Sequence, residues 1–212
     1  MTESSPAITR VAAFDVDGTL TLHDCVVPFL RRIAGVRRLA WGLLRHSPTV
    51  VGAALRRDRD ALKAASAMAA FRGEELARVE AEAEGFARSV FEHDLRPEAL
   101  AALRAHQEAG DTVLLVSASF EVYLRPLAAL LDLDDVLAVR LDVDAHDRLS
   151  GRLSGPNCRG PEKVRRLHAW LGEYAGGRDA VHVTAYGDSR GDREMLADAD
   201  VARWMGRGEM PR

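Results

Sequence analysis

The chain has only two cysteines in 212 residues, and its acidic and basic residues nearly balance. Cys25 and Cys158 lack the paired spacing of zinc sites or disulfide frameworks, and so few cysteines suit a reducing compartment. Lys and Arg total 29 against 32 Asp and Glu, a formal net charge of −3, which gives no overall attraction to nucleic acid. These absences argue against a disulfide-rich secreted domain and against a nucleic-acid-binding protein.

The sequence also lacks signals for export or for spanning a membrane. Residues 1–10 are polar and do not follow the basic, apolar, small-residue order of a secretory signal. The most apolar candidate segment, residues 39–55, is interrupted by Arg45, His46 and Pro48 and is shorter than the roughly 20 residues that a membrane-spanning helix needs. We therefore expect a cytoplasmic protein.

A short acidic motif, Asp15-Val16-Asp17-Gly18-Thr19, follows an apolar run at residues 11–14 that predicts a buried strand. Open α/β sheets place their active sites at the carboxyl ends of strands. An aspartate such as Asp15 can attack phosphorus directly, and Asp17 can transfer a proton to a leaving group. The same five residues are also ordinary turn residues, so the motif alone leaves both interpretations open.

Three later segments contain further polar residues at predicted element ends. Ser117 ends an apolar run that predicts a strand, Lys163 opens a predicted helix, and Asp188 and Asp192 follow another predicted strand. Taken singly, these residues are equally consistent with a strand-end cap, a solvent-facing helix residue, a loop turn and a helix N-cap. Their joint occurrence with the first motif favours a catalytic interpretation.

The order of these four motifs resembles that of the haloacid dehalogenase superfamily, in particular its phosphoserine phosphatase-like branch. The resemblance implies that Asp15 is the nucleophile, that Asp17 is the general acid/base, and that Ser117 and Lys163 bind phosphate. An acid at position 17 favours phosphate esters over dehalogenation, because an alkoxide leaving group must be protonated.

The same resemblance implies a Mg²⁺ cofactor. The Asp15 carboxylate, the Asp17 backbone carbonyl and the Asp188 carboxylate would bind the metal, and Asp192 would order metal-bound water or pair with Lys163. Hard oxygen ligands of this kind are those that Mg²⁺ prefers.

Strand and helix signals alternate after about residue 95, whereas residues 24–94 appear helical throughout. We therefore predict an α/β fold, a three-layer Rossmann-like core with a mostly parallel sheet, formed by residues 1–23 and 95–212, plus an inserted all-helical cap at 24–94. Expected elements include helices at 97–109, 120–131 and 163–171, strands at 113–117, 136–141, 181–187 and 201–204, and a hairpin at 148–153.

The substrate is less clearly indicated. Asp24 stands where phosphoserine phosphatases have a Glu that receives the substrate amine, and Ala118-Ser119 replaces their usual pair of glycines. Asp24 and Ser119 are therefore candidate specificity residues, although Asp24 is equally consistent with a helix N-cap. A second resemblance, at Asp24 and residues 158–163 and 204–209, is to related phosphatases that include a bacterial phosphatidylglycerophosphate phosphatase.

The early part of the predicted cap is basic, with arginines such as Arg37 and Arg38 interleaved with apolar residues such as Leu39 and Trp41. This pattern is consistent with peripheral contact at the inner face of an anionic membrane, or with a helix pair that has an apolar seam and solvated arginines. The expected partner is a phosphorylated small molecule or a lipid headgroup.

We expect a Mg²⁺-dependent phosphomonoester hydrolase that forms an aspartyl phosphate, with phosphoserine phosphatase as an alternative. Two alternatives come from other classes: a phospho-aspartate receiver domain and a noncatalytic phospholigand-binding module. A receiver domain needs neither a helical insert nor the Asp17 acid. The intact set of Asp15, Asp17, Lys163 and Asp188 argues against a noncatalytic module.

Overall fold

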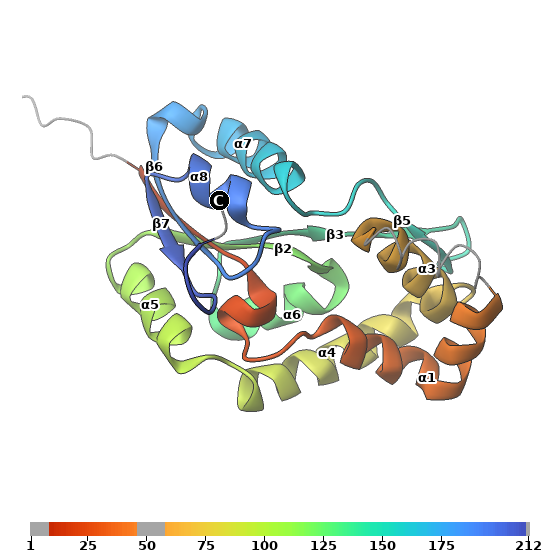
Figure 1. The fold of residues 1–212 in the computed structure, drawn as a ribbon. Coiled ribbons are helices and arrows are strands. Elements are labelled where there is room, and N and C mark those ends of the chain that lie inside the picture. The colour runs from red at the N-terminus through yellow and green to blue at the C-terminus, as the bar shows by residue number, and fades with distance from the viewer. Residues whose placement is uncertain (1–8, 46–57, 211–212) are drawn as a thin grey trace, which may run out of the picture.

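The computed structural model describes residues 9–45 and 58–210. Five parallel strands form one sheet in the order β3-β2-β1-β6-β7 (Figure 1). The strands are β1 (Thr9–Phe14), β2 (Thr112–Phe120), β3 (Asp135–Val139), β6 (Val181–Gly187) and β7 (Val201–Trp204). The mostly parallel α/β sheet predicted from the sequence is confirmed.

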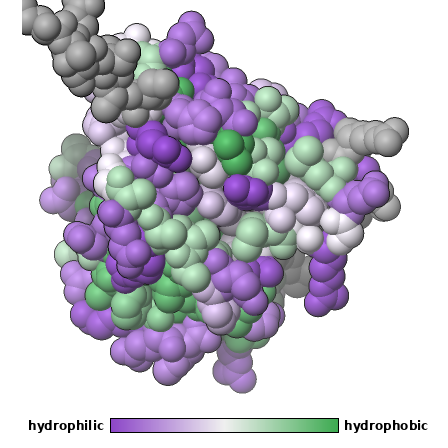
Figure 2. Space-filling model, turned by 90° about the vertical axis from the view of Figure 1, so that its left-hand side faces the viewer, coloured by the Kyte–Doolittle hydropathy of each residue, from purple (hydrophilic) through white to green (hydrophobic). Residues whose placement is uncertain are grey.

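The central strands are continuous apolar runs because helices cover both faces of the sheet. Helices α7 (Pro161–Ala175) and α8 (Arg193–Asp198) lie on one side, and α5 (Pro97–Glu108) and α6 (Glu121–Leu131) lie on the other (Figure 1). Residues 11–14 of β1 are fully buried between these layers. The face on the left-hand side of Figure 1 presents many hydrophilic residues with smaller apolar areas between them (Figure 2).

The register of the sheet brings the ends of β1 and β6 to one level, beside the middle of β2. Phe14, the last residue of β1, pairs with Leu115 of β2 and with Tyr186 of β6. The residues that follow β1 and β6 therefore come out at the same edge of the sheet, although they are far apart in the sequence, and β2 continues beside them to Phe120. A short turn segment, η1 (Val16–Leu20), continues directly from β1 at this edge.

Between β1 and α5 the described residues form α1 (Val26–Arg45), α3 (Arg59–Phe71) and α4 (Leu76–His93). The predicted helical character of this region is confirmed for the described residues, and its division from the core as a cap stays a prediction. The chain leaves the sheet and returns to it through paired segments: Leu22 N donates to the Asp94 carbonyl at 2.8 Å, and Arg96 N donates to the Leu20 carbonyl at 2.9 Å. We call this pairing the neck.

An aromatic cluster joins the helical region to the sheet layer. Phe29 of α1 lies 4.7 Å from Tyr123 of α6 between ring centroids, and Phe71 of α3 lies 5.1 Å from Phe120 at the end of β2. Phe86 of α4 also packs against Tyr123. The two parts of the chain therefore share one buried apolar core.

Several expected elements have different bounds in the structure, among them β2, which continues to Phe120. The predicted strand 136–141 is wrong at its end, because β3 stops at Val139 and Leu141 begins a separate strand, β4 (Leu141–Val143), which pairs with β5 (Leu149–Leu153). The resulting antiparallel hairpin confirms the predicted hairpin. Helix α7 is longer than predicted, since it starts at Pro161 and ends before Gly176, whose left-handed backbone caps it.

No described helix is long and apolar enough to cross a membrane. Most of the candidate segment 39–55 lies outside the described residues. On the described part of α1, Trp41 is 67% exposed whereas Leu39 is buried. Contact of this surface with a membrane stays a prediction.

Candidate active site

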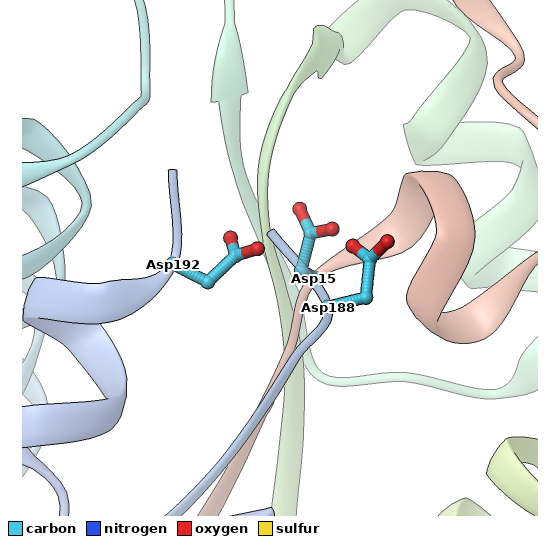
Figure 3. A group of neighbouring side chains, drawn as sticks. All are labelled: Asp15, Asp188 and Asp192. Atoms are coloured by element: carbon cyan, nitrogen blue, oxygen red, sulfur yellow. The ribbon is translucent and has the colours of Figure 1, made fainter. Parts of the chain in front are cut away.

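The structure brings the residues of all four sequence motifs to one edge of the sheet. Asp15 follows β1, Asp188 follows β6, and Asp192 immediately precedes α8. Their carboxylates lie close together, with Asp192 directed toward Asp15, although Asp188 and Asp192 are separated from Asp15 by more than half of the chain (Figure 3). Ser117 is buried in β2, which continues to Phe120 with an irregular register rather than ending at Ser117 as predicted.

Lys163, in the first turn of α7, is almost completely buried and is not a solvent-facing residue. Its Nζ donates hydrogen bonds at 2.6 Å to Asp15 Oδ1, to Asp192 Oδ1 and to the Val116 carbonyl. Burial lowers the pKa of Lys163, but the two carboxylates outweigh it and raise the pKa above its usual range. Lys163 is therefore a fixed positive charge beside Asp15.

Asp15 lies in a strongly desolvated position. Burial raises its pKa to about 7 even though Lys163 acts in the opposite direction. Its backbone N donates to the Tyr186 carbonyl at 3.0 Å, which fixes the start of η1 to the neighbouring strand. Asp15 is therefore held in place by two contacts, from its backbone N to Tyr186 and from its carboxylate to Lys163.

Both carboxylate oxygens of Asp17 accept hydrogen bonds. Cys25 N donates to Oδ1 at 2.7 Å, and the Ser119 hydroxyl donates to Oδ2. Burial, and next the negative charge of Asp24, raises the pKa of Asp17, while these hydrogen bonds act against the rise. A carboxyl group whose protonated form is favoured in this way is suited to donate a proton.

One oxygen each from Asp15, Asp188 and Asp192 lie within 4.8 Å of one another. A cluster of hard oxygen donors fits Mg²⁺. Gly18 is required beside it, because its φ is +81° and a side chain there would overlap the Asp188 carboxylate. Of the three, Asp192 is the most committed to protein contacts: Oδ1 accepts from Lys163, and Oδ2 accepts from Ser189 N at 2.9 Å and from Ser189 Oγ at 2.8 Å.

The two candidate specificity residues differ in position. Asp24 lies at the cavity wall, but its Oδ1 accepts from Val26 N at 2.9 Å and from Val27 N at 3.2 Å, which is the geometry of a helix N-cap. Ser119 is buried and contacts Asp17, and it is not among the residues that line the cavity. The hydrogen bonds thus connect Ser119 to the proposed general acid.

A cavity of about 560 Å³ opens over these groups. Its floor is formed by the catalytic candidates Asp15, Asp17, Ser117, Lys163, Asp188 and Asp192, and its walls include residues of α1 and α3. Residues of the helical region therefore border the cavity through which a ligand reaches these groups.

Sequence analysis missed several residues around the site. Thr19 Oγ1 donates to Asp188 Oδ1 at 3.3 Å, and Arg96 Nη2 donates to the Gly18 carbonyl. Lys63 of α3 donates from Nζ to the Ala118 carbonyl. Thr19 lies inside the first motif and could have been found there, whereas no local pattern distinguishes Arg96 or Lys63 from other basic residues of the chain.

The chain matches the haloacid dehalogenase-like hydrolase family over residues 12–197. It is 38% identical over 190 residues to protein CicA of Caulobacter vibrioides, which covers 90% of this chain and 83% of that protein. This chain belongs to the haloacid dehalogenase-like hydrolase family, as the four motifs indicated, and is thus an enzyme of the hydrolase class. A shorter match, 28% identical over 95 residues, is to histidinol-phosphatase of Neisseria meningitidis and covers 44% of this chain and 43% of that protein.

Solved structures share the fold. A Bordetella pertussis protein of unknown function superposes with a TM-score of 0.73 at 23% identity, covering 90% of this chain and 87% of that chain. A phospho-aspartyl intermediate analogue of phosphoserine phosphatase superposes with a TM-score of 0.58 at 19% identity, covering 91% and 84%. At these identities the likeness concerns the fold alone.

Proposed function

We propose that this hydrolase is a Mg²⁺-dependent phosphatase that cleaves phosphomonoesters through an aspartyl phosphate on Asp15. The observation that carries the proposal is the position of Asp15: it is buried beneath the cavity, with the Lys163 ammonium at 2.6 Å and Asp188 within reach of the same cation. Asp17, two residues further on, supplies a carboxyl group with a raised pKa. Family membership favours this hydrolase function over a receiver domain.

In the first step, a carboxylate oxygen of Asp15 attacks phosphorus and the bond from phosphorus to the leaving-group oxygen breaks. Asp17 gives its proton to that oxygen, so the product leaves as an alcohol. Lys163 and the hydroxyl of Ser117 place positive charge and a hydrogen-bond donor near the phosphoryl oxygens, where negative charge is spread in the transition state.

In the second step, Asp17 accepts a proton from water, and the water oxygen attacks the phosphorus of the aspartyl phosphate. Inorganic phosphate leaves and the Asp15 carboxylate is restored. When bound by Asp15, Asp188 and the Asp17 carbonyl, Mg²⁺ supplies positive charge that neutralises phosphoryl oxygens. Asp192 keeps Lys163 oriented through the 2.6 Å contact between the two side chains.

The proposed organisation is a catalytic core of residues 1–23 and 95–212 with residues 24–94 as a cap over the cavity. Support comes from the cavity walls, to which α1 contributes Val26 and α3 contributes Lys63. In this arrangement the cap selects the leaving group while the core performs the reaction. A phosphorylated small molecule is the expected substrate, with phosphoserine or a lipid headgroup as specific candidates.

The test is release of inorganic phosphate from para-nitrophenyl phosphate with Mg²⁺, for the wild type and for Asp15→Asn. We expect Asp15→Asn to lose several orders of magnitude in kcat, since its amide cannot form the covalent intermediate. Arg165→Gln is the matched control, because Arg165 is exposed on α7 and pairs only with Glu162 among the described residues.

The alternatives give different results in the same assay. A wild type that becomes phosphorylated on Asp15 without releasing phosphate would indicate a receiver domain. Neither phosphorylation nor release would indicate a binding module. Equal turnover by Asp15→Asn and the wild type would refute the proposed nucleophile.

A further inference from the structure

Besides Lys163, three cationic side chains of the described residues line the same cavity. Arg59 and Lys63 come from α3, and Arg159 comes from the loop that precedes α7. Within residues 9–45 and 58–210, the guanidinium groups of Arg59 and Arg159 have no hydrogen-bond or ion-pair partner. Among the same residues, Lys63 donates only to the neutral Ala118 carbonyl, and its Nζ lies 4.3 Å from the centroid of the Phe120 ring.

The acidic groups nearby are already engaged by the protein. Asp24 caps α1 through its Oδ1, and Asp60 accepts a hydrogen bond from Asn157 Nδ2 at 2.7 Å. Asp15 and Asp192 hold Lys163. Apart from the catalytic candidates, the cavity is therefore lined, within the described part of the chain, by three cationic side chains and by one carboxylate, Asp24, whose Oδ1 is already used by the helix cap.

Apolar side chains line part of the same cavity. They are contributed by the segment before α1, by α1 itself and by α3, and they are Leu22, Val26, Val27, Leu30 and Leu62. Leu22 and Val27 are nearly half exposed, at 47% and 45%. A ligand that covered these two side chains would remove apolar surface from water, and neither side chain has a polar group that would lose its hydrogen bonds.

The cavity is also large for a phosphate group alone. Its volume of about 560 Å³ lies within the range of roughly 300–1,000 Å³ that is common for pockets that enclose small organic ligands. Asp15, Arg59 and Arg159 line this one cavity, so a single ligand of that size can contact both the catalytic end and the two arginines.

We propose that the substrate is a phosphomonoester whose leaving group carries a second anionic group, a carboxylate or a phosphodiester, bound by Arg59, Lys63 and Arg159, and carries no ammonium. This inference rests on the proposed phosphatase function and specifies the substrate class of the same site. Charge-assisted hydrogen bonds from guanidinium groups suit both kinds of oxyanion. The apolar side chains of the cavity wall would contact a carbon chain attached to that anionic group.

A panel of phosphomonoesters with and without a second anionic group tests the proposal. The compounds 3-phosphoglycerate and glycerol 3-phosphate compare a carboxylate with a neutral group, and phosphoserine adds an ammonium. Short-chain phosphatidylglycerophosphate and lysophosphatidate compare a lipid that has a phosphodiester with one that has none. We expect kcat/KM to be about tenfold higher for the anionic member of each pair, and lower for phosphoserine than for 3-phosphoglycerate.

Variants locate the subsite. Arg59→Gln and Arg159→Gln should each lower the anionic-to-neutral ratio of kcat/KM about fivefold, the size expected for one charge-assisted contact at a partly exposed site. Arg37→Gln is the matched control, since Arg37 is exposed on α1 and does not line the cavity. A ratio near one in the wild type, or a ratio that neither cavity variant changes, would overturn the inference.

Binding of the same compounds to Asp15→Asn, measured by calorimetry, separates this inference from the proposed function. Tighter binding of the anionic compounds without turnover by the wild type would refute the phosphatase and support the subsite. Turnover without a charge preference would support the phosphatase function and refute the anion subsite. The lipid and non-lipid pairs show whether the second anion belongs to a phosphodiester or to a carboxylate.

Discussion

Removal of the Lys163 ammonium tests the electrostatic arrangement of the site directly. In Lys163→Met the side chain keeps much of its length and its apolar part but loses its charge. Asp15 and Asp192 would then face each other in a buried position without the cation that contacts both of them at 2.6 Å. One carboxyl group would take up a proton, and the protein would lose a buried ion-pair network.

The magnitude follows from the burial of all three groups. Loss of one partner of a buried ion pair costs about 3–5 kcal/mol, because the remaining charge stays desolvated. For 212 residues the entropy of unfolding is about 0.45 kcal/mol per degree, so the expected fall in melting temperature is about 7–11 °C. Phosphatase activity should be lost as well, since Lys163 contacts the proposed nucleophile.

Calorimetric or fluorescence-monitored melting of the metal-free protein provides the measurement. Arg165→Gln on the same helix is the control and should change stability by less than about 0.5 kcal/mol. The double variant Lys163→Met/Asp192→Asn should recover part of the loss, because one of the two opposed charges is gone. A melting temperature of Lys163→Met within a degree of the wild type would refute the argument that Lys163 compensates buried charge.

Three further predictions concern neighbouring groups. Asp24→Ala should cost about 1 kcal/mol of stability through the lost N-cap without a selective loss of phosphoserine turnover, and a selective loss would instead make Asp24 an amine receptor. Ser119→Ala removes the hydroxyl that donates to Asp17, so kcat should fall about tenfold with KM unchanged; a wild-type kcat would show that the contact does not orient the acid. Burial raises the pKa of Asp15 to about 7, so protons compete with Mg²⁺ below that pH, and the melting-temperature rise on Mg²⁺ addition should be larger at about pH 8 than at about pH 5.5. Equal rises would contradict a role for Asp15 as a ligand.

The position of the site was predictable because strand ends and short motifs are local features. Asp15 and Asp188 each follow an apolar run, and parallel strands that pair in register bring such ends together. Lys163 was assigned to the site through the family resemblance, because a lysine at a helix start has no such meaning by itself, and the structure shows it contacting Asp15. The overall sheet could be predicted for the same reason.

Contacts between elements that are distant in the sequence were harder to predict. The hydroxyl of Ser119 reaches Asp17 only because β2 continues past Ser117, which the apolar run ending at Val116 does not reveal. Lys63 reaches Ala118 through the packing of α3 against the sheet layer, and helical periodicity does not specify that packing. The break after Val139 was also hidden, because Leu141 continues the apolar alternation although it belongs to the hairpin.

The neck has a consequence for how this protein can diversify. Because Leu22 is paired with Asp94, the chain departs from the sheet and rejoins it at neighbouring points, so the intervening segment can be exchanged without a change in the positions of the strand ends. The aromatic cluster sets the condition for such an exchange: a replacement must cover Phe120 and Tyr123, which the present helices bury. Under the proposed function, recombination at these two points would place a different leaving-group pocket over the same carboxylates.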